Sequence, residues 1–112
     1  MIITKSEEVY FSQLTPAMAY MLYKLEQFHR RNVGPDLVIT AMANGTHMTG
    51  SKHYTNEAMD IRSHNFLDTD SKLDFARDFG SFLGPKFTVI LESIGQSNEH
   101  FHVQVKRGGT YP

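Results

Sequence analysis

Two segments of the chain carry apolar residues at the spacing of an amphipathic helix. In the first, apolar side chains recur every three or four positions from residue 18 to residue 28, which places them on one helical face. Thr15 followed by Pro16 is typical of a helix start, with threonine as the N-cap and proline as the first helical residue. We predict a helix that runs to about residues 29–31 and is ended by Gly34 and Pro35. Its apolar positions are Met18, Met21, Leu22, Leu25 and Phe28.

The second helical pattern lies in the C-terminal half of the chain. Ser71 followed by Asp74 resembles an N-terminal capping arrangement, so we predict that the helix starts near Ser71. Gly84 and Pro85 are expected to end it. The apolar positions of this helix are Leu73, Ala76, Phe79, Phe82 and Leu83.

Short β-prone runs separate and follow the two helices. Residues 37–40, 87–92 and 101–105 are rich in β-branched and aromatic residues and are predicted to be strands. Residues 51–54 and 58–62 are predicted to be extended segments joined by a tight turn at Thr55 and Asn56. The order helix, strands, helix and two strands favours an α+β fold, in which a small antiparallel sheet carries the helices on one side.

Composition narrows the class of protein further. A chain of 112 residues can bury one modest core, so residues 1–112 are expected to form a single domain. A hydrophobic content of 40% and a charged content of 21% are those of a globular protein rather than a disordered one. The net charge of −1 gives no field that would attract nucleic acid or an anionic membrane. Cysteine is absent, so any metal site must use nitrogen and oxygen ligands.

We expect the protein to be cytoplasmic as synthesised, without a signal peptide. Glu7 and Glu8 lie where a signal peptide would have an apolar run. No apolar stretch approaches the length that spans a bilayer, so membrane insertion is not expected. If the substrate lies outside the membrane, another factor must carry the protein to it. The expected oligomeric state is a monomer.

Histidine and acidic residues gather in two short segments. The first holds His53 and Asp60, and the second holds Glu99, His100 and His102. On a strand, His100 and His102 point to the same face, while Glu99 reaches that face only if it lies at the junction of loop and strand. A catalytic zinc site keeps three such ligands and leaves one position for water, which a nearby carboxylate can deprotonate. The alternative is that the histidines are ordinary surface residues and that Asp60 only pairs with its neighbours.

The same residues resemble a known family of zinc peptidases. The family comprises D-alanyl-D-alanine carboxypeptidases, D,D-dipeptidases and phage L-alanyl-D-glutamate endolysins, and shares its fold with the N-terminal signalling domain of hedgehog. Its pattern is Ser-x-His-x-x-Gly-x-Ala-x-Asp, followed downstream by an acid three residues before a final His. The matching residues in this sequence are Ser51, His53, Asn56, Ala58 and Asp60, followed by Glu99 and His102.

The resemblance implies a role for each matching residue. It assigns the zinc ligands to His53, Asp60 and His102 and the general base to Glu99. His100 falls where a neighbouring histidine would polarise the substrate carbonyl. Glu92, at the end of a predicted strand, is the rival candidate for the base. The three-residue spacing between Glu99 and His102 favours Glu99.

The sequence departs from the family pattern at two places. The glycine of the first motif is replaced by Asn56, which also tolerates a left-handed backbone. Members that act on peptidoglycan usually have an arginine shortly after the first strand, and residues 40–47 contain none. The candidate substrate-binding residues in its place are His47, Ser51, Lys52 and Arg62.

The resemblance implies a zinc metallopeptidase that hydrolyses amide bonds in the stem peptides or cross-links of bacterial peptidoglycan. Such a protein would act on the cell wall after release from the cytoplasm or as part of a virion. The alternative is a non-catalytic zinc-containing binding domain of the same fold. A third possibility, a globular domain with fortuitous histidines, predicts no stoichiometric metal.

Overall fold

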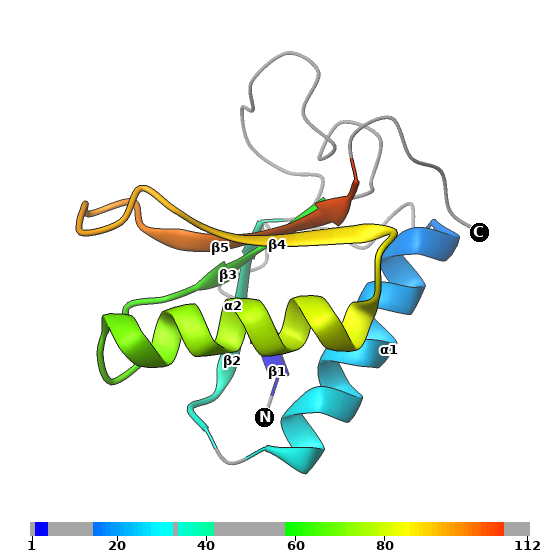
Figure 1. The fold of residues 1–112 in the computed structure, drawn as a ribbon, viewed down its shortest axis with the longest axis horizontal. Helices are drawn as coiled ribbons and strands as arrows, with labels where there is room; N and C mark the ends of the chain where they lie inside the picture. The colour runs from blue at the N-terminus through cyan, green and yellow to red at the C-terminus, as the bar shows by residue number, and fades with distance from the viewer. Residues whose placement is uncertain (1, 5–14, 33, 42–57, 107–112) are drawn as a thin grey trace.

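The structure is a computed structural model, and it describes residues 2–4, 15–32, 34–41 and 58–106. Within these ranges the chain forms five strands and two helices (Figure 1). In chain order they are β1 (Ile2–Thr4), α1 (Pro16–Arg31), β2 (Leu37–Ala41), β3 (Ala58–Arg62), α2 (Thr69–Leu83), β4 (Phe87–Glu92) and β5 (His100–Val105).

The five strands form one sheet in the order β1-β2-β3-β5-β4. The contacts of β2 with β3, β3 with β5 and β5 with β4 are antiparallel, as predicted. Strand β1 pairs in parallel with β2, so the sheet is mixed, and the prediction of a purely antiparallel sheet is wrong at this edge. Three residues are too few for a periodic pattern to be visible in a sequence. The α+β class is confirmed.

The predicted start of α1 is confirmed at the level of single atoms. Thr15 is extended, and its hydroxyl oxygen accepts a hydrogen bond of 3.1 Å from the backbone N–H of Met18. This bond satisfies one of the N–H groups that a helix leaves unpaired in its first turn. Pro16 follows as the first helical residue. The buried face of α1 consists of Ala17, Met18, Met21 and Leu25.

The predicted start of α2 is wrong by a few residues because a different side chain caps the helix. Asp68 is the N-cap, and its carboxylate accepts hydrogen bonds of 2.8 Å from the backbone N–H and from the hydroxyl of Ser71. These bonds favour the charged carboxylate and lower the pKa of Asp68. Ser71 therefore supplies donors to the cap and does not itself cap the helix. At the other end, Gly84 has a φ of 102°, a backbone conformation that glycine adopts without strain.

One hydrophobic core joins both helices to one face of the sheet. The side chains of β3 and β5 alternate, so that Met59, Ile61, Phe101 and Val103 are buried. They belong to the same cluster as buried residues of α1 and α2, including Met21, Leu25 and Phe79. Both helices thus pack on the apolar face of the sheet, as the sequence predicted. Neither helix in the described ranges has the length and hydropathy needed to cross a membrane.

Candidate metal centre

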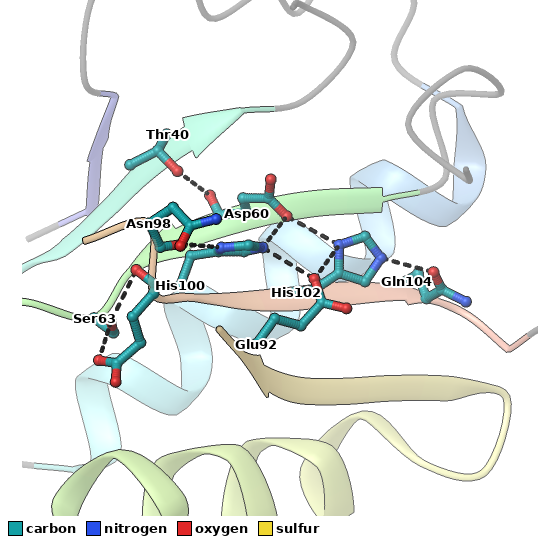
Figure 2. Close-up of polar contacts among 9 residues, drawn as sticks. Thr40, Asp60, Ser63, Glu92, Asn98, His100, His102 and Gln104 are labelled. Atoms are coloured by element: carbon teal, nitrogen blue, oxygen red, sulfur yellow. Dashed lines mark hydrogen bonds and ion pairs between the residues drawn. The ribbon is translucent and has the colours of Figure 1, made fainter. Parts of the chain in front are cut away.

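The opposite face of β3 and β5 carries a group of polar side chains. Asp60 on β3 is directly paired with His102 on β5, and Arg62 is paired with His100 in the same register. Because alternate residues of a strand share a face, His100 and His102 both lie beside Asp60 (Figure 2). One ligand atom from each of Asp60, His100 and His102 lies within 4.8 Å of the others. The structure therefore brings together three of the residues singled out in the sequence.

His102 has a hydrogen-bond partner at each ring nitrogen. Its Nδ1 lies 3.0 Å from Oδ1 of Asp60, and its Nε2 lies 2.7 Å from Oε1 of Gln104 (Figure 2). Burial disfavours the charged ring and would lower its pKa, but the hydrogen bonds with Asp60 and Gln104 and the negative charges of Asp60 and Glu92 outweigh burial. The pKa of His102 is consequently raised above its ordinary value of 6.5.

His100 also has an oxygen acceptor near each ring nitrogen. Its Nδ1 lies 2.7 Å from the backbone oxygen of Asn98. Its Nε2 lies 3.0 Å from Oε1 of Glu92 and 3.8 Å from Oδ1 of Asp60. A carbonyl oxygen and an ionised carboxylate only accept hydrogen bonds, so each ring nitrogen of His100 faces an acceptor. Nε2 is the nitrogen that faces the two carboxylates.

The two histidines therefore share one pattern. In each ring, one nitrogen is anchored by an oxygen acceptor, Asn98 O or Gln104 Oε1, and the other nitrogen faces Asp60. Histidines that bind metals commonly have one ring nitrogen bonded to an oxygen acceptor, which orients the other nitrogen toward the cation. Two imidazoles and a carboxylate can hold a divalent metal ion with a preference for nitrogen and oxygen ligands. The sequence pattern did not predict the parts played by Asn98 and Gln104.

Those two residues differ in how visible they are in a sequence. Gln104 lies two positions after His102 on the same strand face, so strand periodicity could have found it. Asn98 acts through its backbone oxygen, which every residue type has, so no side-chain signal marks it.

The predicted general base, Glu99, points elsewhere. Its carboxylate is buried and receives three hydrogen bonds: from Lys72 Nζ at 2.5 Å, from Ser63 Oγ at 2.7 Å and from the backbone N–H of Gly95 at 2.8 Å. The bonds from Lys72, Gly95 and Ser63 outweigh burial and lower the pKa of Glu99 to about 2. A carboxylate in this setting is a weak proton acceptor, and the arrangement does not fit Glu99 as a general base. The acidic side chain beside the histidines is Glu92.

Arg62 borders a shallow pocket on the same face of the sheet. The pocket has a volume of about 280 Å³. Asp60 and His100 line it together with Arg62, so it opens directly beside the candidate metal ligands. The remaining lining residues are Thr40, His64, Ser97, Asn98 and Glu99. Thr40 donates its hydroxyl to the backbone oxygen of Asp60 at 3.4 Å, which links β2 to the pocket wall.

Four of the predicted site residues, His47, Ser51, Lys52 and His53, lie outside the described residues, as does the predicted turn at Thr55 and Asn56. The candidate centre formed by Asp60, His100 and His102 thus contains two of the three predicted zinc ligands and one residue predicted to be catalytic.

Comparison with known proteins yields no relative. No protein-family model matches the sequence, and no curated protein and no solved structure is significantly similar to the chain. The likeness to zinc peptidases therefore stands on the motif residues alone.

Proposed function

We propose that this protein is a zinc-dependent peptidase that hydrolyses amide bonds in bacterial peptidoglycan peptides, with the fold of the family that its motifs resemble. One observation carries the proposal. Nε2 of His100 and Nδ1 of His102 converge on Asp60, while the oxygens of Asn98 and Gln104 hold the other two ring nitrogens. Two nitrogen donors and one carboxylate oxygen form a donor set that suits zinc.

Asp60 and His102 are the ligands on which the motif resemblance and the described geometry agree. The third ligand is His53 by the resemblance and His100 by the proximity of its Nε2 to Asp60. The two alternatives have different consequences. If His53 is the ligand, His100 is left to contact the substrate carbonyl. If His100 is the ligand, His53 is dispensable for metal binding.

Bound zinc would supply Lewis acidity and lower the pKa of a water molecule toward neutrality. The protein must then provide a proton acceptor, and we assign this role to Glu92. Its Oε1 lies 3.0 Å from His100 Nε2 and 4.0 Å from His102 Nδ1, and its side chain is 44% exposed. Glu92 would accept the proton of the attacking water and deliver it to the leaving amine nitrogen.

The substrate class rests on the motif resemblance. The pocket beside Asp60 and His100 supports it, because Arg62 lies in the pocket wall and a guanidinium can bind a peptide carboxylate through two hydrogen bonds. Access to peptidoglycan would require release from the cytoplasm or incorporation into a virion.

A non-catalytic zinc-binding domain is the second candidate. The position of Glu99 favours this candidate. The resemblance assigns the general base to Glu99, but its carboxylate accepts hydrogen bonds from Lys72 and Ser63. This candidate predicts a bound metal without hydrolysis.

Metal content and hydrolysis, measured on the same preparation, test the proposal. The protein is purified without added metal, its zinc content is measured, and release of peptides from purified peptidoglycan is followed. His102→Ala is the loss-of-metal variant, and Arg77→Met, on the exposed side of α2, is the matched control. One zinc per chain with hydrolysis that His102→Ala abolishes supports the peptidase. One zinc without hydrolysis supports the binding domain, and no zinc uptake contradicts both.

A further inference from the structure

The Glu99 carboxylate links three segments of the chain: α2, the residue after β3, and the loop between β4 and β5. Lys72 comes from the first turns of α2, Ser63 follows β3 directly, Gly95 lies in the loop between β4 and β5, and Glu99 itself precedes β5. The side chains of Lys72 and Glu99 are only 13% and 3% exposed. Charge-assisted hydrogen bonds shielded from water are among the stronger polar contacts in a protein. The contacts of Glu99 are therefore suited to hold the loop between β4 and β5 in one conformation.

The loop that these contacts hold has an unusual backbone. Ser93 and Gly95 have φ values of 55° and 81°, which lie in the left-handed region. The N–H of Gln96 bonds to the oxygen of Ser93, and the N–H of Glu99 bonds to the oxygen of Gln96. The bond from Gly95 N–H to Glu99 closes the loop from its other end. The conformation of the loop thus depends on where the Glu99 carboxylate is held.

This loop also supplies the oxygen that orients His100. The backbone oxygen of Asn98 accepts from His100 Nδ1 at 2.7 Å (Figure 2). Asn98 precedes Glu99, so a displacement of Glu99 moves the Asn98 carbonyl group. Without this acceptor, the His100 ring keeps only the contacts of Nε2 with Glu92 at 3.0 Å and with Asp60 at 3.8 Å. The ring can turn about contacts made through a single nitrogen, so the Asn98 oxygen is needed to fix its orientation.

We infer that Lys72 is a positioning residue for the candidate metal centre: by holding the Glu99 carboxylate, it places the Asn98 oxygen that orients the His100 ring with Nε2 toward Asp60. Glu99 acts here as a structural anchor. The consequence for metal binding rests on the proposed function, whereas the consequence for the His100 ring does not. Lys72 lies 27 positions from Glu99 and belongs to neither motif that suggested the site.

The test compares Lys72→Met with wild type in two measurements. The first is the contact between Nδ1 of His100 and the Asn98 oxygen in the metal-free protein, from proton–nitrogen NMR correlations of the imidazole ring. We expect Lys72→Met to weaken this contact, which shifts the Nδ1 signal of His100, and to leave the His102 ring unchanged. The second is the zinc affinity, which we expect to fall tenfold or more, as is typical when a partner of a metal-binding histidine is lost.

Two further variants make the result decisive. Arg77→Met removes the ion pairs that Arg77 forms with Asp74 and Asp78 on the exposed side of α2. It should change neither measurement. Ser63→Ala removes one donor and keeps the Lys72 ion pair, so it should shift both measurements in the same direction by less. It carries the test alone if Lys72→Met does not fold.

An unchanged Nδ1 signal of His100 in the folded Lys72 or Ser63 variant would overturn the inference. The test distinguishes a failure of the inference from a failure of the proposed function. If wild-type protein takes up no zinc, the proposed function fails, but the comparison of the Nδ1 signals still decides whether Lys72 positions His100. If wild type binds zinc and Lys72→Met binds it equally well with the same Nδ1 signal, only the inference fails.

Discussion

Asp60 and His102 face one another across the β3–β5 ladder, with Oδ1 of the carboxylate 3.0 Å from Nδ1 of the ring. They lie 42 positions apart in the sequence, and both are largely buried, with side-chain exposures of 14% and 12%. A buried carboxylate beside an imidazole stabilises the protonated ring in the absence of a metal and offers two adjacent ligand atoms to a cation.

Replacing Asp60 by Asn should affect both properties of this pair. The amide keeps the shape of the side chain but lacks its charge, so the pKa of His102 in the metal-free protein should fall toward its ordinary value. Zinc affinity should fall by more than the roughly 10–100-fold that loss of an outer-shell partner costs. NMR titration and competition with a chelator measure the two effects. An unchanged pKa would show that Asp60 and His102 do not pair in solution.

Zinc affinity should depend on pH in the direction set by His102. Protons compete with a metal for the ring nitrogen, and the pKa of His102 is raised above 6.5. Affinity should therefore increase as pH rises through that raised pKa. Metal-free protein should behave in the opposite way: the stability that His102 contributes is complete below pH 6.5 and is lost as pH rises through the folded pKa. Unfolding with urea across this range, with and without zinc, measures both.

Glu99 should make the protein sensitive to acid. Its pKa is lowered from 4.5 to about 2, so the stability it contributes is present above pH 4.5 and is lost as pH falls from 4.5 toward 2. The loss should be on the order of 3 kcal/mol. Glu99→Gln should flatten the pH dependence of the unfolding free energy in this window. Glu26→Gln is the control, because Glu26 forms an exposed ion pair with Arg30.

Kinetics of the glutamine variants at saturating zinc should show whether Glu92 or Glu99 is the general base. Glu92→Gln should lower turnover by about 10²–10⁴-fold, the range typical for loss of a general base. Glu99→Gln should weaken zinc binding but keep turnover within about tenfold once zinc is saturating. The reverse outcome, near-normal zinc binding with turnover lost only in Glu99→Gln, would return the role of base to Glu99.

The buried side chains of β5 should contribute to the free energy of unfolding without contacting the candidate metal centre. Phe101 lies between His100 and His102 in the sequence and is fully buried on the opposite face of the sheet. Its ring centroid lies 4.9 Å from that of Phe66 and 4.8 Å from that of Phe75. Phe101→Ala should destabilise the protein by about 3–5 kcal/mol through lost burial and the cavity it leaves. Phe101→Leu, which leaves a smaller cavity, should cost less. Urea unfolding of zinc-free protein measures both, and equal stabilities would contradict the packing.

Much of the fold follows from local patterns in the sequence. Thr15 and Pro16 mark the start of α1, and two-residue alternation places His100 and His102 on one face and Phe101 on the other. These are properties of neighbouring residues. The start of α2 was missed because Ser71 can act as a cap or as a donor to one, and only the backbone conformation of Asp68 distinguishes the two. Strand β1 is defined by its partner β2 rather than by its own three residues.

The sequence determined which residues can act as ligands, and the tertiary structure decided which of them meet. Strand alternation alone places Glu99 on the face of Phe101, whereas a position at a loop junction would let its side chain reach the opposite face. Its actual direction depends on Lys72, 27 positions earlier on a helix that packs under the sheet. A buried carboxylate turns to the side where donors satisfy its charge, and the location of those donors is a property of the folded chain.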